Sequence, residues 1–148
     1  METKLTNLEN KGVIGERYIA EKLCALGYEI IFVGGAVKFT IDNSRFFTAD
    51  FLCYKDGKAF WVQAKYKEPR IKYPDTGLEL YRWENLHWLQ TQSNISALIL
   101  FTDNTQKIYG NWIDKLKKEK HGGEFNTQNG QEMIYFWLKD LKEMEQFL

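Results

Sequence analysis

Cysteine, proline, histidine and net charge are all scarce in this chain of 148 residues. It has 2 cysteines, 2 prolines and 2 histidines, and its 20 basic residues balance its 20 acidic ones. Cys24 and Cys53 lack CxxC spacing, so we expect them to be small buried hydrophobes in a reducing compartment. The zero balance gives no general attraction to nucleic acid, so any phosphate contact must come from a local basic patch.

Long apolar runs are missing as well. The first residues lack the apolar core of a signal peptide. No stretch approaches the roughly 20 apolar residues of a membrane helix. We therefore expect an intracellular, cytoplasmic protein with no membrane partner. The chain does have 44% hydrophobic and 16% aromatic residues, which indicates one folded domain over residues 1–148.

Hydrophobic periodicity predicts a mixture of helices and strands. Helices are expected at about 10–26, 78–92 and 139–147, and strands at 28–33, 46–54, 59–66, 97–101, 108–112 and 133–138. Residues 67–77, which hold both prolines, are expected to form a loop. Because the strands carry apolar residues on both faces, the predicted fold class is α/β, a three-layer α/β/α domain with a mixed central sheet.

Two of the predicted strands meet at Asp56-Gly57, a dipeptide typical of two-residue hairpin loops. The register that this loop sets places Asp50 directly opposite Gln63 and puts Lys65 on the diagonal from Asp50. Since side chains alternate along a strand, Asp50, Gln63 and Lys65 project from the same face. This spacing suits two ligands that share a divalent cation, with an ammonium group beside them.

Asp50 interrupts an apolar run, where a carboxylate needs a compensating partner or a metal. Mg²⁺ takes such oxygen ligands, and the Lys65 charge would orient an attacking water and stabilise developing negative charge. The alternative is a structural salt bridge between Lys65 and Asp50, with Gln63 merely polar. Glu16 lies on the packing face of the first predicted helix, and it either assists the metal or pairs with a buried lysine.

A basic segment with interleaved aromatics follows Lys65. Tyr66, Lys67, Arg70 and Lys72 belong to it. Cations and aromatic rings beside a cleft suit phosphate contact and base stacking, so these residues are candidates for nucleic-acid binding. The alternative for the same segment is a solvated loop.

The strand pair resembles that of the PD-(D/E)XK nuclease superfamily, with Asp50 as the first acidic ligand and Gln63-Ala64-Lys65 in place of (D/E)XK. The triplet is similar to the QxK variant of Mrr-type restriction endonucleases. Chain size is similar to that of archaeal Holliday-junction resolvases and small phage nucleases. The helix around Glu16 resembles the first core helix of these enzymes. The resemblance covers a core of about 11–101 in the order αβββαβ, and residues 102–148 are expected to add a C-terminal strand and helix.

The resemblance implies a restriction-endonuclease-like core in which Asp50, Gln63 and the carbonyl of Ala64 bind Mg²⁺ or Mn²⁺. Lys65 would act on the water or the phosphate, and Glu16 would give support. It implies an endonuclease that hydrolyses DNA, either structure-specific or restriction-like, and that acts as a homodimer. Gln63 removes a negative charge from the site. The alternative is therefore a nuclease-fold module that no longer cuts and binds nucleic acid or protein instead.

Overall fold

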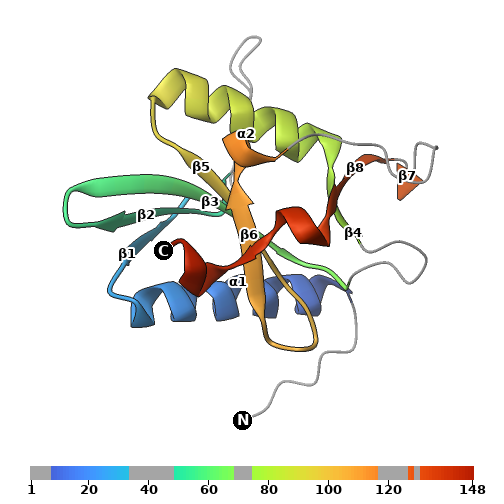
Figure 1. Cartoon of the computed structure of the whole chain (residues 1–148), viewed down its shortest axis with the longest axis horizontal. Helices are drawn as coiled ribbons and strands as arrows, with labels where there is room; N and C mark the ends of the chain where they lie inside the picture. The colour runs from blue at the N-terminus through green and yellow to red at the C-terminus, as the bar shows by residue number, and fades with distance from the viewer. Residues whose placement is uncertain (1–7, 34–48, 69–74, 117–126, 129–130) are drawn as a thin grey trace.

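The computed structural model describes residues 8–33, 49–68, 75–116, 127–128 and 131–148, which Figure 1 shows in colour. Its elements in chain order are α1 (Leu8–Ala25), β1 (Glu29–Phe32), β2 (Phe51–Lys55), β3 (Lys58–Tyr66), β4 (Asp75–Glu79), α2 (Leu80–Ser93), β5 (Ala97–Thr102), β6 (Ile108–Trp112), η1 (Ile113–Lys115), β7 (Thr127–Gln128), β8 (Gln131–Trp137), η2 (Leu138–Asp140), β9 (Lys142–Glu143) and η3 (Met144–Gln146). The helices η1, η2 and η3 are single 3₁₀ turns. Neither α-helix has the length and apolar character needed to cross a membrane.

A six-stranded central sheet has the strand order β1-β2-β3-β5-β6-β9. β3 and β5 run parallel, and the other neighbouring pairs are antiparallel. Two parallel neighbours need a crossover connection, which α2 supplies. The mixed central sheet predicted from the sequence is confirmed.

Helices cover the sheet on opposite sides, α1 on one and α2 on the other (Figure 1). On the α1 side, Ile19 and Leu23 pack with Val62 of β3. On the α2 side, Leu86 packs with Phe101 of β5. The strands β3 and β5 are therefore buried on both faces, which confirms the three-layer arrangement.

The hairpin of β2 and β3 has the predicted register. Lys55 faces Lys58, and Phe51 faces Val62. The loop residues Asp56 and Gly57 both have positive φ, 51° and 77°, as a type I′ turn requires. Asp50 directly precedes β2, and residues 46–48 of the predicted strand lie outside the described residues.

A second, three-stranded sheet of order β4-β8-β7 was missed by the sequence prediction. The expected loop is wrong from Asp75 onward, and α2 begins at Leu80 rather than at 78. β4 is a strand because β8 pairs with it antiparallel along its whole length. A Cβ on Gly77 would lie 2.7 Å from the Tyr135 ring, so only glycine permits this close approach.

The closing helix predicted at 139–147 is wrong. Two 3₁₀ turns occupy this segment, and β9 between them pairs with β6. Leu141 and Met144 are both buried, three residues apart. A spacing of three suits successive 3₁₀ turns as well as an α-helix, so the apolar pattern did not distinguish the two.

Candidate active site

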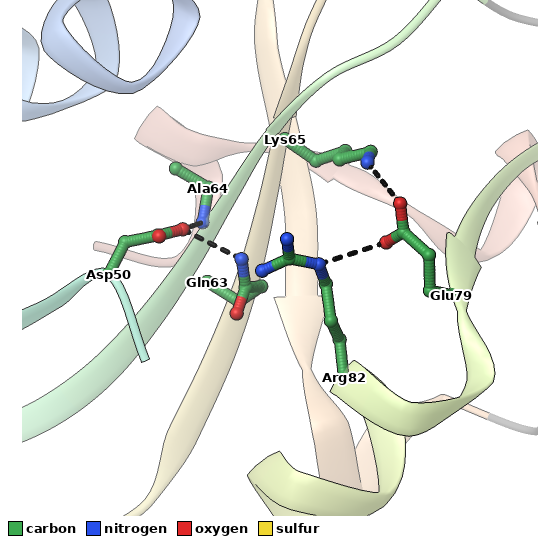
Figure 2. Close-up of polar contacts among 6 residues, drawn as sticks. All are labelled: Asp50, Gln63, Ala64, Lys65, Glu79 and Arg82. Atoms are coloured by element: carbon green, nitrogen blue, oxygen red, sulfur yellow. Dashed lines mark hydrogen bonds and ion pairs between the residues drawn. The ribbon is translucent and has the colours of Figure 1, made fainter. Parts of the chain in front are cut away.

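The carboxylate of Asp50 is held by two hydrogen bonds to one of its oxygens (Figure 2). Oδ2 accepts from Nε2 of Gln63 and from the backbone N–H of Ala64, each at 2.7 Å. The backbone of Asp50 joins the sheet, because its N–H donates to Val62 O at 2.9 Å and its carbonyl accepts from Val33 N–H at 3.1 Å. The residue is therefore fixed at the margin of β2, with its side chain directed at the middle of β3.

Both backbone groups of Ala64 face the side of β3 on which Asp50 lies. The Trp61 N–H donates to Ser96 O and the Lys67 N–H donates to Thr102 O, so the odd-numbered residues of β3 bond toward β5. Successive residues of a strand bond to opposite sides. The carbonyl of Ala64 therefore points to the same side of β3 as its N–H, toward Asp50. This carbonyl is the one predicted to bind a metal.

Gln63 is buried, with 2% of its surface exposed. While Nε2 donates to Asp50, the Oε1 atom has no hydrogen-bond partner. An unpaired buried acceptor costs about 1–3 kcal/mol. Figure 2 shows Oε1 on the side of the amide that faces away from Asp50, so this oxygen would reach a cation beside the carboxylate only after the amide turned over.

Glu16 lies where α1 approaches the sheet closely. A Cβ added to the preceding Gly15 would lie 2.7 Å from Cβ of Tyr66 and 3.3 Å from Cγ2 of Thr102. Burial and the neighbouring charge of Asp50 raise the pKa of Glu16 to about 7. The ionisation of Glu16 is therefore coupled to the charge of Asp50.

The pKa of Asp50 is also raised. Burial is the largest cause, and it outweighs the hydrogen bond from Ala64 and the positive charges of Arg82 and Lys65. The raised pKa values mean that both carboxyl groups are harder to ionise than usual. A cation bound nearby would favour the ionised forms and lower both pKa values.

Lys65 pairs with Glu79 and not with Asp50. Its Nζ donates to Oε1 of Glu79 at 2.6 Å, and the two side chains are 24% and 17% exposed. The salt bridge with Asp50 considered in the sequence analysis is therefore not formed. Burial alone would raise the pKa of Glu79, but the hydrogen bond and charge of Lys65 bring it below its ordinary value. Lys65 still lies close enough to Asp50 to act on its ionisation.

Glu79 and Arg82 were not predicted from the sequence to belong to the site. Glu79 ends β4, and Arg82 lies in the first turn of α2 with its Nε 3.1 Å from Glu79 Oε2. Both residues fell inside the helix predicted at 78–92, where an i,i+3 pair of opposite charge is an ordinary surface feature. The one available signal was the strand lysine Lys65, which needed an acidic partner.

Oxygen donors at this site fit a hard divalent cation. The described residues include no cluster of three His, Cys, Asp or Glu side chains that could hold a metal alone. Mg²⁺ is commonly held by one or two carboxylates, with waters and substrate phosphates completing its shell. The carboxylate of Asp50 and the neighbouring carbonyl of Ala64 supply oxygen atoms for this smaller requirement.

Part of the predicted nucleic-acid-binding segment can be placed. Tyr66 and Lys67 are half-buried at the end of β3, and Nζ of Lys67 lies 5.9 Å from the ring centroid of Tyr135. Arg70 and Lys72 lie outside the described residues. Their contact with nucleic acid stays a prediction.

Comparison with known proteins identifies a likeness in structure. No family model and no curated protein matches the sequence. The Holliday junction resolvase Hjc of Archaeoglobus fulgidus, an archaeal hyperthermophile, matches with a TM-score of 0.66 and 13% sequence identity, over 92% of this chain and 93% of that chain. The two chains share one fold. The α/β, restriction-endonuclease-like fold predicted from the sequence is thereby confirmed.

Proposed function

We propose that this protein is a metal-dependent DNA endonuclease that cuts structured DNA. The observation that carries the proposal is the convergence of Asp50, Gln63 and Ala64 at one margin of β3, with Lys65 two residues from Gln63 on the same face. The charge of Asp50 also acts on the pKa of Glu16 in α1. The likeness to a Holliday junction resolvase supports the class of substrate. The Mrr-like character of the triplet is part of the proposal, since it rests on the sequence alone.

Asp50, the carbonyl of Ala64 and, with its amide turned over, Oε1 of Gln63 would hold Mg²⁺ or Mn²⁺, and Glu16 would give support. Such an ion supplies Lewis acidity at the phosphate and a water of lowered pKa. The chain's own contribution is preorganisation. The hydrogen bond from the backbone N–H of Ala64 fixes the Asp50 carboxylate before any substrate arrives, which limits the reorganisation needed during the reaction.

Lys65 supplies the positive charge of the site. Its ammonium would stabilise the negative charge that develops on the phosphate during attack. The side chain is 24% exposed, so a DNA strand can reach it. Glu79 holds the ammonium in place in the absence of substrate.

The proposed partner is DNA, and the proposed assembly is a homodimer. A four-way junction is two-fold symmetric, and its resolution needs two cuts at related positions, which two copies related by a two-fold axis would make. Because the chain has no net charge, its affinity must come from local cations, and Lys67, Arg70 and Lys72 are the proposed ones.

A second function, a nuclease-fold binding module that does not cut, is favoured by one observation. Gln63 is neutral and already satisfies Asp50 through a hydrogen bond, which reduces the need for a metal at this carboxylate. Titration with Mg²⁺ and Mn²⁺ separates the two functions. Binding that Asp50→Asn abolishes supports the nuclease, and no binding supports the module.

The proposal is tested on a substrate panel with Mg²⁺ or Mn²⁺. A four-way DNA junction, supercoiled plasmid, linear duplex, single-stranded DNA and duplex RNA are incubated with the wild type, Lys65→Ala and Lys58→Ala. Lys58 lies on the same strand but is exposed at the hairpin end, so its variant is the matched control. We expect the junction to be cut fastest and Lys65→Ala to be slower by about 10²–10³-fold. Equal rates for all three proteins would overturn the proposal.

A further inference from the structure

The guanidinium of Arg82 is a cationic group beside the site with no role in the function proposed above. Its Nε lies 3.1 Å from Oε2 of Glu79, but the two groups are misaligned, and neither atom makes a hydrogen bond. Figure 2 shows the two terminal nitrogens on the side of the guanidinium away from Glu79, one of them turned toward the amide of Gln63. The side chain is 31% exposed, so these donors are accessible to a ligand.

Two neighbours restrain the guanidinium in this orientation. Glu79 faces its Nε edge, and the ring centroid of Tyr81 lies 5.3 Å from Cζ. Burial raises the pKa values of both Asp50 and Glu16, and the charge of Arg82 opposes both rises. Arg82 therefore acts electrostatically on the same two carboxylates that define the site.

Glu79 is shared by two cations. It accepts a hydrogen bond from Lys65 through Oε1 and faces Arg82 through Oε2. One carboxylate cannot neutralise both, so the group of Lys65, Arg82 and Glu79 keeps one positive charge in excess. A phosphodiester carries one negative charge, and a guanidinium binds two phosphate oxygens in a planar, bidentate manner. A single ion pair between Glu79 and one cation would carry no net charge.

We propose that Arg82 binds a phosphate of the DNA strand that enters the site, through its terminal nitrogens, and that Glu79 is a positioning residue that orients Arg82 and Lys65 together. This inference rests on the proposed function, because it adds a phosphate-binding residue to the same site.

The phosphate contact is tested by binding in the absence of divalent metal. Fluorescence anisotropy measures the affinity of a four-way DNA junction in EDTA over a series of salt concentrations. We expect Arg82→Gln to reduce the slope of log K against log salt by about 1, the change for one lost phosphate contact. Arg17→Gln is the matched control, because Arg17 forms an exposed ion pair with Glu21 on α1, and we expect it to leave the slope unchanged.

The positioning role of Glu79 is tested by single-turnover cleavage with Mg²⁺ at saturating DNA. We expect Glu79→Gln, which keeps the shape but removes the charge, to lower the rate at least tenfold without weakening junction binding in EDTA. Glu79→Asp should restore part of the rate. Adding Arg82→Gln to Glu79→Gln should cost less than Arg82→Gln alone, because the two residues act together.

The results distinguish a failure of the proposed Arg82 contact from a failure of the proposed nuclease function. If the wild type cuts the junction while Arg82→Gln binds with an unchanged slope, the inference fails and the nuclease stands. Thermal melting checks that each variant is folded. If Arg82→Gln does not fold, Arg82→Lys replaces it, and we expect this variant to keep the slope but cut more slowly, since the planar fork is lost. A rate equal to that of the wild type would overturn the inference. A wild type that neither binds nor cuts any DNA removes the proposed function, and the inference with it.

Discussion

The side-chain amide of Gln63 donates to Oδ2 of Asp50 at 2.7 Å, and the same oxygen accepts the N–H of Ala64 at the same distance. A neutral amide thus occupies the position beside Asp50 where a second carboxylate would bring charge repulsion. Asp50 is well held without a metal, and the site carries little negative charge. Affinity for a divalent cation must then depend strongly on Asp50 and Glu16.

A carboxylate at position 63 should lower the stability of the metal-free protein and raise its affinity for a divalent cation. In Gln63→Glu the donor to Asp50 is lost and two carboxylates face each other, so we expect the metal-free protein to lose about 1–3 kcal/mol of unfolding free energy at neutral pH. Mg²⁺ should then stabilise this variant more than it stabilises the wild type, since it binds only the folded site. Urea denaturation with and without Mg²⁺ measures both effects.

Gln92→Glu, an equivalent change on the exposed part of α2, is the control and should respond to Mg²⁺ as the wild type does. If Gln63→Glu also responds as the wild type does, no cation binds beside Asp50.

Two glycines of α1 should respond oppositely to alanine. A Cβ on Gly15 would meet Tyr66 at 2.7 Å, so Gly15→Ala should lose about 1–3 kcal/mol and should also slow cleavage by displacing Glu16. A Cβ on Gly12 meets nothing within 4 Å, so Gly12→Ala should gain about 0.5–1 kcal/mol from helix propensity. Urea denaturation of the two variants tests the close approach of α1, and similar effects from both would contradict it.

Ionisation of Glu16 should make stability depend on pH. Its pKa is about 7 in the folded protein, against an ordinary value of 4.5. The folded state therefore holds this proton more tightly than the unfolded chain does. The stability that the protonated carboxyl contributes is full below pH 4.5 and is lost as the pH rises through about 7.

The measurement is the unfolding free energy of the metal-free protein across this pH range. The wild type should lose stability relative to Glu16→Gln between these two pH values and stay level above them. Glu21→Gln, on the exposed side of α1, is the matched control. Parallel curves for the wild type and Glu16→Gln would show that burial and the charge of Asp50 do not raise the pKa of Glu16.

Local signals in the sequence were enough to predict the hairpin and its register. Asp56-Gly57 fixes the loop type, and the register of the two strands follows from it without knowledge of the rest of the fold. The contact between Asp50 and Gln63 is a direct consequence of that register. The bounds of α1, β1, β5 and β6 follow hydrophobic periodicity in the same way and agree with the prediction within two residues.

Contacts between distant segments could not be predicted in this way. β4 is a strand because β8, more than fifty residues later, pairs with it. That pairing ends at Glu79 and places its carboxylate beside Lys65. No spacing in the sequence indicates this contact. In the C-terminal segment, the apolar spacing of Leu141 and Met144 suits two kinds of helix, and the short pairing of β9 with β6 decides between them.

The central claim, metal-dependent cleavage at Asp50, is tested most directly by single-turnover cleavage of a four-way DNA junction with Mg²⁺ or Mn²⁺. Asp50→Asn removes one charge, and Asp56→Asn makes the same chemical change in the hairpin loop, where asparagine tolerates the positive φ. We expect Asp50→Asn to be slower than the wild type by at least about a hundredfold and Asp56→Asn to match the wild type. Cleavage by Asp50→Asn at the rate of the wild type would contradict the account.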